Sequence, residues 1–65
     1  MMITVEIEGD FLNFMRDGHV FYDPAIPSPA DIGRFFRHMG GKTWFTPELK
    51  AETLRLVREY YEGEV

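Results

Sequence analysis

The sequence predicts an α+β domain in which a three-stranded antiparallel meander is followed by two α-helices packed on one sheet face, in the order β-β-β-α-α. The prediction depends on three observations. Residues 3–8 alternate apolar and polar side chains, glycine-containing dipeptides at 9–10 and 17–18 separate strand-like runs, and two later segments open with Ser-Pro or Thr-Pro before an apolar stripe. The chain has 65 residues and no cysteine. We therefore expect one small domain, residues 1–65, without disulfides.

The two turn dipeptides set the register of the meander. Gly first at residues 9–10 suits a type II′ turn, and Asp-Gly at residues 17–18 suits type I′. Directly opposed residues share a sheet face, so Phe14 should lie opposite Phe21. A three-residue loop at 16–18 with a bulge is the alternative, and it would turn the third strand over. The preferred register places these apolar residues on one face: Ile3, Val5, Ile7, Leu12, Phe14 and Phe21.

A proline-rich connector leads into the first helix. Residues 23–29 hold three prolines, which favours a stiff extended crossover; a polyproline recognition motif is the alternative. Ser28 is expected to cap the helix with Pro29 at its first position. An apolar stripe follows at helical spacing, and the glycines at 40–41 predict a left-handed end. The stripe consists of Ile32, Phe35, Phe36 and Met39.

The second helix repeats the same start signal. Thr46 is the expected N-cap and Pro47 the first helical residue, and the helix should run to about Tyr61. One broad face is mostly apolar and should pack on the sheet, while the opposite face is charged. The buried face comprises Leu49, Thr53, Leu56, Val57, Tyr60 and Tyr61.

The charge of −4 is unevenly distributed along the chain. Residues 1–31 hold six acidic residues against one basic, residues 32–58 hold six basic against two acidic, and residues 59–65 add three acidic. The acidic first part repels nucleic acid and favours basic partners. Neither an apolar run long enough for a membrane span nor a signal-peptide pattern is found, so we expect a cytoplasmic protein with no membrane contact.

The patterns that carry chemistry are weak in this sequence. The run at residues 40–43, Gly-Gly-Lys-Thr, resembles the end of a phosphate-binding loop, but Phe36 stands where the first glycine belongs. His19 and His38 have no metal-ligand spacing. A domain of this size has little room for a substrate pocket between two carboxylates. We therefore expect no catalytic residues, no metal and no cofactor.

The second face of the sheet is too apolar for an ordinary solvent face. In the preferred register it carries Thr4, Glu6, Glu8, Phe11, Asn13, Met15, Val20 and Tyr22. An exposed apolar patch of this kind marks an interaction site, unless a helix or a second copy of the chain covers it. Neighbouring glutamates could steer a basic partner while apolar side chains anchor it. The predicted partner-binding residues are Glu6, Glu8, Asp10, Phe11, Met15, Val20 and Tyr22.

The sequence thus favours a small acidic protein-binding module over other classes. It would inhibit or modulate a larger protein or complex with a basic surface, and by analogy alone one that handles nucleic acid or serves host defence. A second hypothesis is a nucleic-acid-binding regulator that uses a basic surface of Arg34, Arg37 and Lys42; the glutamates of the second helix argue against it. A third is a structural protein that closes a homodimer through the second sheet face.

Overall fold

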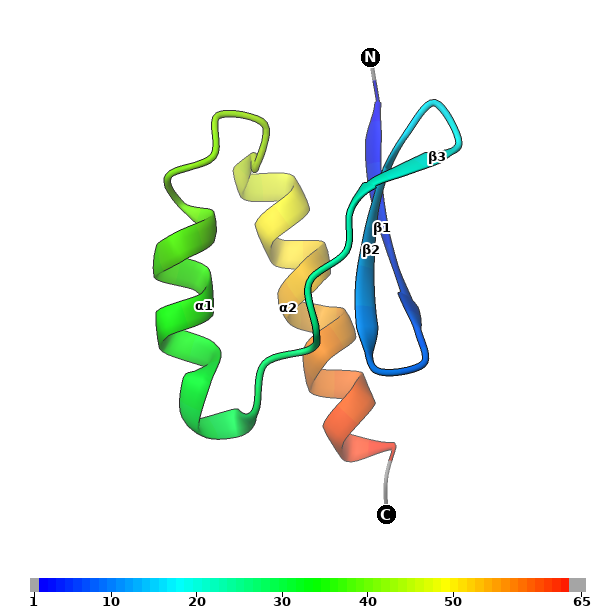
Figure 1. Ribbon diagram of the computed structural model, residues 1–65. Helices are drawn as coiled ribbons and strands as arrows, with labels where there is room; N and C mark the ends of the chain where they lie inside the picture. The colour runs from blue at the N-terminus through cyan, green and yellow to red at the C-terminus, as the bar shows by residue number, and fades with distance from the viewer. Residues whose placement is uncertain (1, 64–65) are drawn as a thin grey trace.

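The computed structural model describes residues 2–63 and confirms the predicted order of elements. Three strands form one antiparallel sheet in the order β1-β2-β3, and both helices lie on the same side of it (Figure 1). Helix α2 contacts β1 directly. The elements are β1 (Ile3–Glu8), β2 (Phe11–Arg16), β3 (His19–Tyr22), a 3-10 turn η1 (Pro29–Asp31), α1 (Ile32–Met39) and α2 (Pro47–Glu62).

The first hairpin has the predicted register. Ile7 lies opposite Leu12 and Val5 opposite Phe14. Gly9 has a φ of 59°, a value that a residue with a Cβ rarely adopts and that a type II′ turn requires at its first position. The alternation of β1 therefore directs its apolar side chains toward the helices.

The second hairpin departs from the predicted register after its turn. Asp17 and Gly18 have φ values of 53° and 82°, as a type I′ turn requires. Beyond the turn, however, Phe14 lies opposite Tyr22, because an irregularity places an extra residue, Phe21, in β3. The predicted pairing of Phe14 with Phe21 is wrong for this reason.

Packing against the single tryptophan accounts for this bulge. The Trp44 ring lies 5.0 Å from the ring of Phe21 and 5.9 Å from that of Tyr22, measured between centroids. Both aromatic rings therefore project to the helix-bearing side of the sheet, as two residues opposing one in a bulge can do. Trp44 is half-buried and also contacts Phe14 at 5.3 Å.

The connector extends the sheet before it reaches the helices. The backbone N–H of Leu12 donates to the Pro24 carbonyl at 2.9 Å, and that of Ile26 donates to the Asp10 carbonyl at 2.8 Å. An isolated bridge between Phe11 and Ala25 lies between these bonds. The proline-rich segment is therefore held against β2 in the place that β3 leaves free.

The first helix begins and ends differently from the prediction. Its first turn is the 3-10 turn η1, and the Ser28 hydroxyl donates to the Asp31 carboxylate at 3.0 Å instead of capping the backbone. At the other end Gly40 has a φ of −62° and stays right-handed, while its N–H donates to the Phe36 carbonyl at 3.0 Å. The predicted left-handed end is wrong, because a right-handed turn closes the helix without it.

Helix α2 confirms the second start signal. The Thr46 hydroxyl oxygen accepts the N–H of Leu49 at 3.1 Å, which satisfies a donor that the first turn leaves free. Thr53 is fully buried on the sheet-facing side and donates its hydroxyl to the Leu49 carbonyl at 2.8 Å. The buried core joins both hairpin strands to both helices through Val5, Leu12, Phe14, Met39, Leu49 and Val57.

Candidate interaction surface

The sheet face that points away from the helices is uncovered. We call it the outer face; within residues 2–63 it consists of Thr4, Glu6, Glu8, Phe11, Asn13, Met15 and Val20. Phe11 and Val20 keep 49% and 48% of their surface exposed, although both are large apolar residues. Neither helix lies against this face (Figure 1). Of the alternatives that the sequence left open, cover by a helix is therefore ruled out.

Charge and apolar area are divided across the outer face. The side chains on β1 are polar or acidic, and those on β2 and β3 include the apolar residues. Glu8 lies opposite Phe11, and Met15 lies opposite Val20. The face therefore has an acidic column along β1 beside an apolar column along β2 and β3, which is the combination of charged rim and apolar anchor found in interfaces.

One hydrogen bond organises the acidic column. The Asn13 side-chain amide donates to the Glu8 carboxylate at 3.1 Å across the strand pair. Glu6, which lies opposite Asn13, is exposed. The bond from Asn13 restricts the Glu8 side chain, so Glu8 loses less conformational freedom when it binds a cation than an unrestrained glutamate would.

Two residues of the predicted site lie elsewhere. Tyr22 belongs to the helix-bearing side, because the bulge in β3 places it opposite the buried Phe14. The Asp10 carboxylate accepts the hydroxyl of Tyr60, from α2, at 2.8 Å. Asp10 therefore does not extend the acidic column, because its side chain is tied to a helix on the other side of the sheet.

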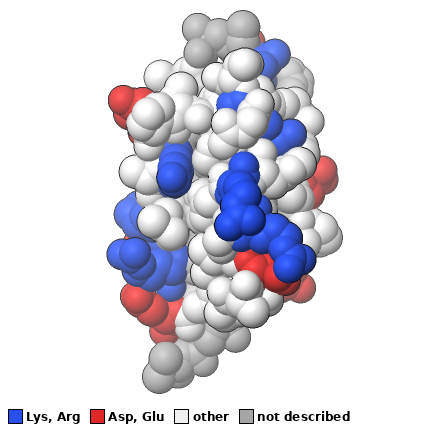
Figure 2. All heavy atoms as spheres, turned by 90° about the vertical axis from the view of Figure 1, so that its left-hand side faces the viewer, with Lys and Arg blue, Asp and Glu red and all other residues white. Residues whose placement is uncertain are grey.

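The helical side of the molecule is basic. Figure 2 views the side on which α1 lies in Figure 1, and Lys and Arg side chains gather across its middle. Arg34 is exposed and lies 3.7 Å from the Asp31 carboxylate, and Arg37 is also exposed. The Lys42 ammonium lies 4.5 Å from the centroid of the Tyr22 ring, in a cation–π contact. The acidic and basic surfaces are thus separated by the thickness of the domain.

An ion-pair group on α2 adds little to the basic side. Arg55 donates to both Glu52 oxygens at 2.8 Å and to the Glu59 carboxylate at 2.6 Å. The bond from Arg55 lowers the pKa of Glu52 below its ordinary value, and the same contacts raise the pKa of Arg55. All three side chains are about half exposed, so the group is a solvated helix surface rather than a charged site.

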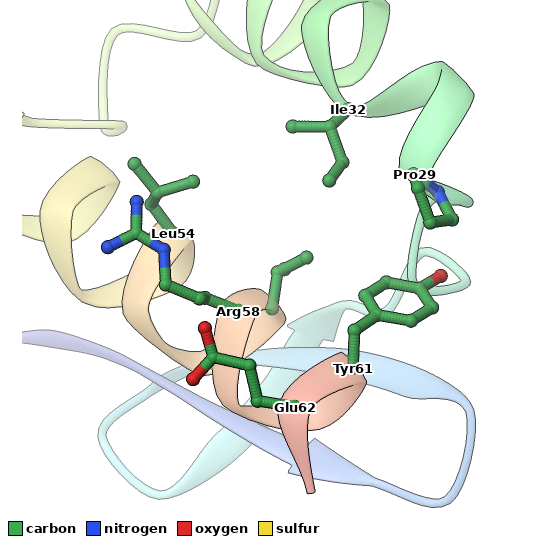
Figure 3. Close-up of a pocket in the computed structure, with 7 residues that line it drawn as sticks. Pro29, Ile32, Leu54, Arg58, Tyr61 and Glu62 are labelled. Carbon is green, nitrogen blue, oxygen red and sulfur yellow. The ribbon is translucent and has the colours of Figure 1, made fainter. Parts of the chain in front are cut away.

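A shallow apolar hollow lies between the two helices. It encloses about 380 Å³ and is lined by Pro29, Ile32, Leu54, Val57, Arg58, Tyr61 and Glu62. Figure 3 shows Pro29 and Ile32 on one side of it, and an arginine and a glutamate of α2, Arg58 and Glu62, at its rim. Opposite charges stand together at this rim, so the hollow has no preference for one sign of ligand.

Within the described residues 2–63, no three histidine, cysteine, aspartate or glutamate side chains gather to hold a metal ion. No helix in the same part of the chain combines the length and apolar character that crossing a bilayer requires. Comparison with known proteins found no family model, no curated protein and no solved structure that matches this chain.

Proposed function

We propose that this chain is a non-catalytic binding module whose outer face docks on a basic surface of a larger protein. The supporting observation is the uncovered apolar column, with Phe11 and Val20 each about half exposed, next to the carboxylates of Glu6 and Glu8. The apolar side chains would supply the lasting contact by leaving water, and the carboxylates would speed and orient the encounter.

Inhibition or modulation is the effect that fits such a module. A domain of 65 residues that occupies a basic groove would exclude anions from it. Grooves built for nucleic-acid phosphates are the most basic surfaces of many proteins. The proposed partner is therefore a nucleic-acid-handling protein, and a defence complex of that kind is included in the proposal.

The test compares charge reversals on the two sides of the molecule. The tagged chain is used to capture proteins from native lysate with and without nuclease, in parallel with Glu6→Lys/Glu8→Lys and with Arg34→Glu/Arg37→Glu. We expect a nuclease-resistant partner that wild type and the arginine variant retain and the glutamate variant loses. A partner retained equally by all three chains contradicts the proposal.

The kinetics of the captured complex then separate steering from anchoring. Glu6→Lys/Glu8→Lys should lower the association rate about tenfold or more and remove its salt dependence, because long-range attraction is lost. Val20→Thr should leave association unchanged and raise the dissociation rate, because it removes apolar contact without changing charge. Surface plasmon resonance at two salt concentrations measures both rates.

Binding of nucleic acid by the helical side is the second candidate. The gathering of Lys and Arg in Figure 2 favours it, and Arg34 and Arg37 are exposed there. It requires a mobility shift of DNA or RNA at low salt that Arg34→Glu/Arg37→Glu abolishes. In the capture experiment the same candidate requires that the captured proteins disappear on nuclease treatment.

A further inference from the structure

Strand β1 has a free edge. The sheet order is β1-β2-β3, so among residues 2–63 β1 is paired on one side only. The two-residue turn at 9–10 makes Glu8 and Phe11 a hydrogen-bonded pair, and such pairs alternate along an antiparallel ladder. The N–H and C=O groups of Ile3, Val5 and Ile7 therefore point outward from the sheet. A strand edge of this kind is a template for another extended segment.

A hollow runs beside that edge, and two glutamates of α2, Glu48 and Glu52, form what we call its acidic lip. It encloses about 230 Å³ and is lined by Ile3, Thr4, Val5, Thr46, Glu48, Leu49 and Glu52. All of these residues belong to β1, to α2 or to the cap of α2, and none belongs to β2 or β3. The hollow therefore lies on the side of β1 that faces away from the rest of the sheet, where a fourth strand would lie.

Carboxylates stand on both sides of the free edge. Glu6 and Glu8 project from β1 on the outer face, and Glu48 projects from α2 beside the hollow. Glu52 also lines the hollow, but its carboxylate is bound to Arg55. Side chains of an added strand alternate between the two sides, so basic residues on either side of such a strand would meet a carboxylate.

We propose that β1 accepts an extended basic segment of the partner as a fourth strand of the sheet. This inference rests on the proposed function and names how the partner docks. Backbone hydrogen bonds to Ile3, Val5 and Ile7 would hold the segment, and Glu48 would select lysine or arginine on its helix-facing side. The added strand would extend the outer face, so the partner would contact both the edge of β1 and the apolar column.

A second copy of this chain is a poorer occupant of the edge. Antiparallel pairing of two β1 strands centred on Glu6 would place Glu6 opposite Glu6 and Thr4 opposite Glu8. A shift by two residues would place Glu6 opposite Glu8 in one direction and opposite Thr4 in the other, and no register sets a basic residue against either glutamate. Like charges directly opposed across strands destabilise the pairing, whereas a basic segment turns the same positions into attractive pairs.

The first experiment measures amide hydrogen exchange by NMR with a defined probe, a synthetic peptide of alternating lysine and valine. At saturating peptide we expect exchange at Ile3, Val5 and Ile7 to slow by about tenfold or more, because their free N–H groups become bonded. Shift changes at Phe11 and Val20 without this protection would overturn the inference, as would the absence of any binding. Protection that appears without peptide and grows with protein concentration would assign the edge to a second copy, and would also overturn it.

The second experiment removes one edge donor without changing a side chain. A chain of 65 residues is within reach of chemical synthesis, so the Ile7 amide can be N-methylated while the ladder bonds of β1 to β2 stay intact. We expect affinity for the peptide to fall roughly fivefold, the value of one hydrogen bond. Unchanged affinity with an unchanged circular dichroism spectrum would contradict edge pairing.

A charge variant tests the acidic lip. Glu48→Gln should weaken peptide binding about twofold to fivefold and reduce its salt dependence, while the matched variant Glu62→Gln at the far end of α2 should have no effect. Equal effects of both variants would show that attraction is general and not located at the edge. The lysate capture with outer-face variants does not depend on these edge amides, so failure of the edge model and failure of the proposed function are distinguishable.

Discussion

The side chain of Phe14 joins the sheet to the segment between the helices. It is fully buried, and its ring lies 6.0 Å from that of Tyr22, 5.3 Å from that of Trp44 and 6.1 Å from that of Phe45. The three partners come from β3 and from the segment between the helices. A substitution at this residue therefore removes contacts both within the sheet and with the loop that leads into α2.

Replacing Phe14 tests that central position. Phe14→Leu should lower the free energy of unfolding by about 1–2 kcal/mol, because edge-to-face ring contacts and part of the buried volume are lost. Phe36→Leu is the matched control, since Phe36 is half-buried and contacts only Phe35 and Phe45 among the aromatic rings. Urea unfolding followed by circular dichroism measures both. Equal costs for the two variants would show that Phe14 has no special role.

At the scale of elements, two nearly identical helix starts have different structures. Thr46 caps α2 with its side chain, whereas Ser28 turns its hydroxyl to Asp31 and its helix begins as a 3-10 turn. Both are followed by proline, so the sequence pattern alone gives one prediction for both. The two starts differ in the residue three positions after the hydroxyl. Asp31 follows Ser28 and its carboxylate accepts the serine hydroxyl, whereas Leu49 follows Thr46 and offers no side-chain acceptor.

This difference has a measurable consequence. Thr46→Ala should destabilise the protein by about 1 kcal/mol, because the Leu49 N–H loses its acceptor. Ser28→Ala should cost less than half as much, because it breaks only an exposed side-chain bond. Thermal unfolding of the two variants is the measurement, and a cost for Ser28→Ala equal to that for Thr46→Ala would refute the assignment of the caps.

The hairpins show how far the sequence predicts the elements. Local turn chemistry determines the β1–β2 register and both turn types, and these predictions are confirmed. The bulge at Phe21 depends on Trp44, which lies more than 20 positions further along the chain. The apolar–polar pattern of the strand therefore cannot predict that contact or the bulge. Because of the bulge, the predicted site residue Tyr22 lies on the helix-bearing side, whereas Phe11, Met15 and Val20 lie on the outer face as predicted.

At the scale of the whole molecule, the charges form two opposite surfaces. Glu6 and Glu8 lie on the outer face, and the basic side chains gather over the helices on the other side (Figure 2). The sequence shows the uneven charge along the chain, but not that the sheet and helices would separate it across the fold. Nor does it place Glu48 beside β1, since that requires the packing of α2 on the sheet.

This arrangement makes a prediction about oligomeric state. We expect a monomer of 7.6 kDa across a dilution series, because the acidic column repels a second copy of itself. Multi-angle light scattering of wild type and Val20→Lys should give the same mass. A dimer that dissociates in Val20→Lys would instead show that the outer face closes on itself, as a symmetric interface would.

The two tyrosines near the end of α2 have a consequence for the order of folding. Their hydroxyls donate to the Asp10 carboxylate and, at 2.5 Å, to the Pro27 carbonyl, which joins positions 50 and 34 residues apart. The hairpins close over two-residue turns within about 1–10 μs, whereas these bonds wait until most of the chain has been brought together. We therefore expect these bonds to form late, so Tyr60→Phe and Tyr61→Phe should accelerate unfolding more than they slow folding, as stopped-flow kinetics in urea would measure. On this expectation the two hydroxyls lengthen the lifetime of the native state from the side of the sheet that the proposed partner does not touch.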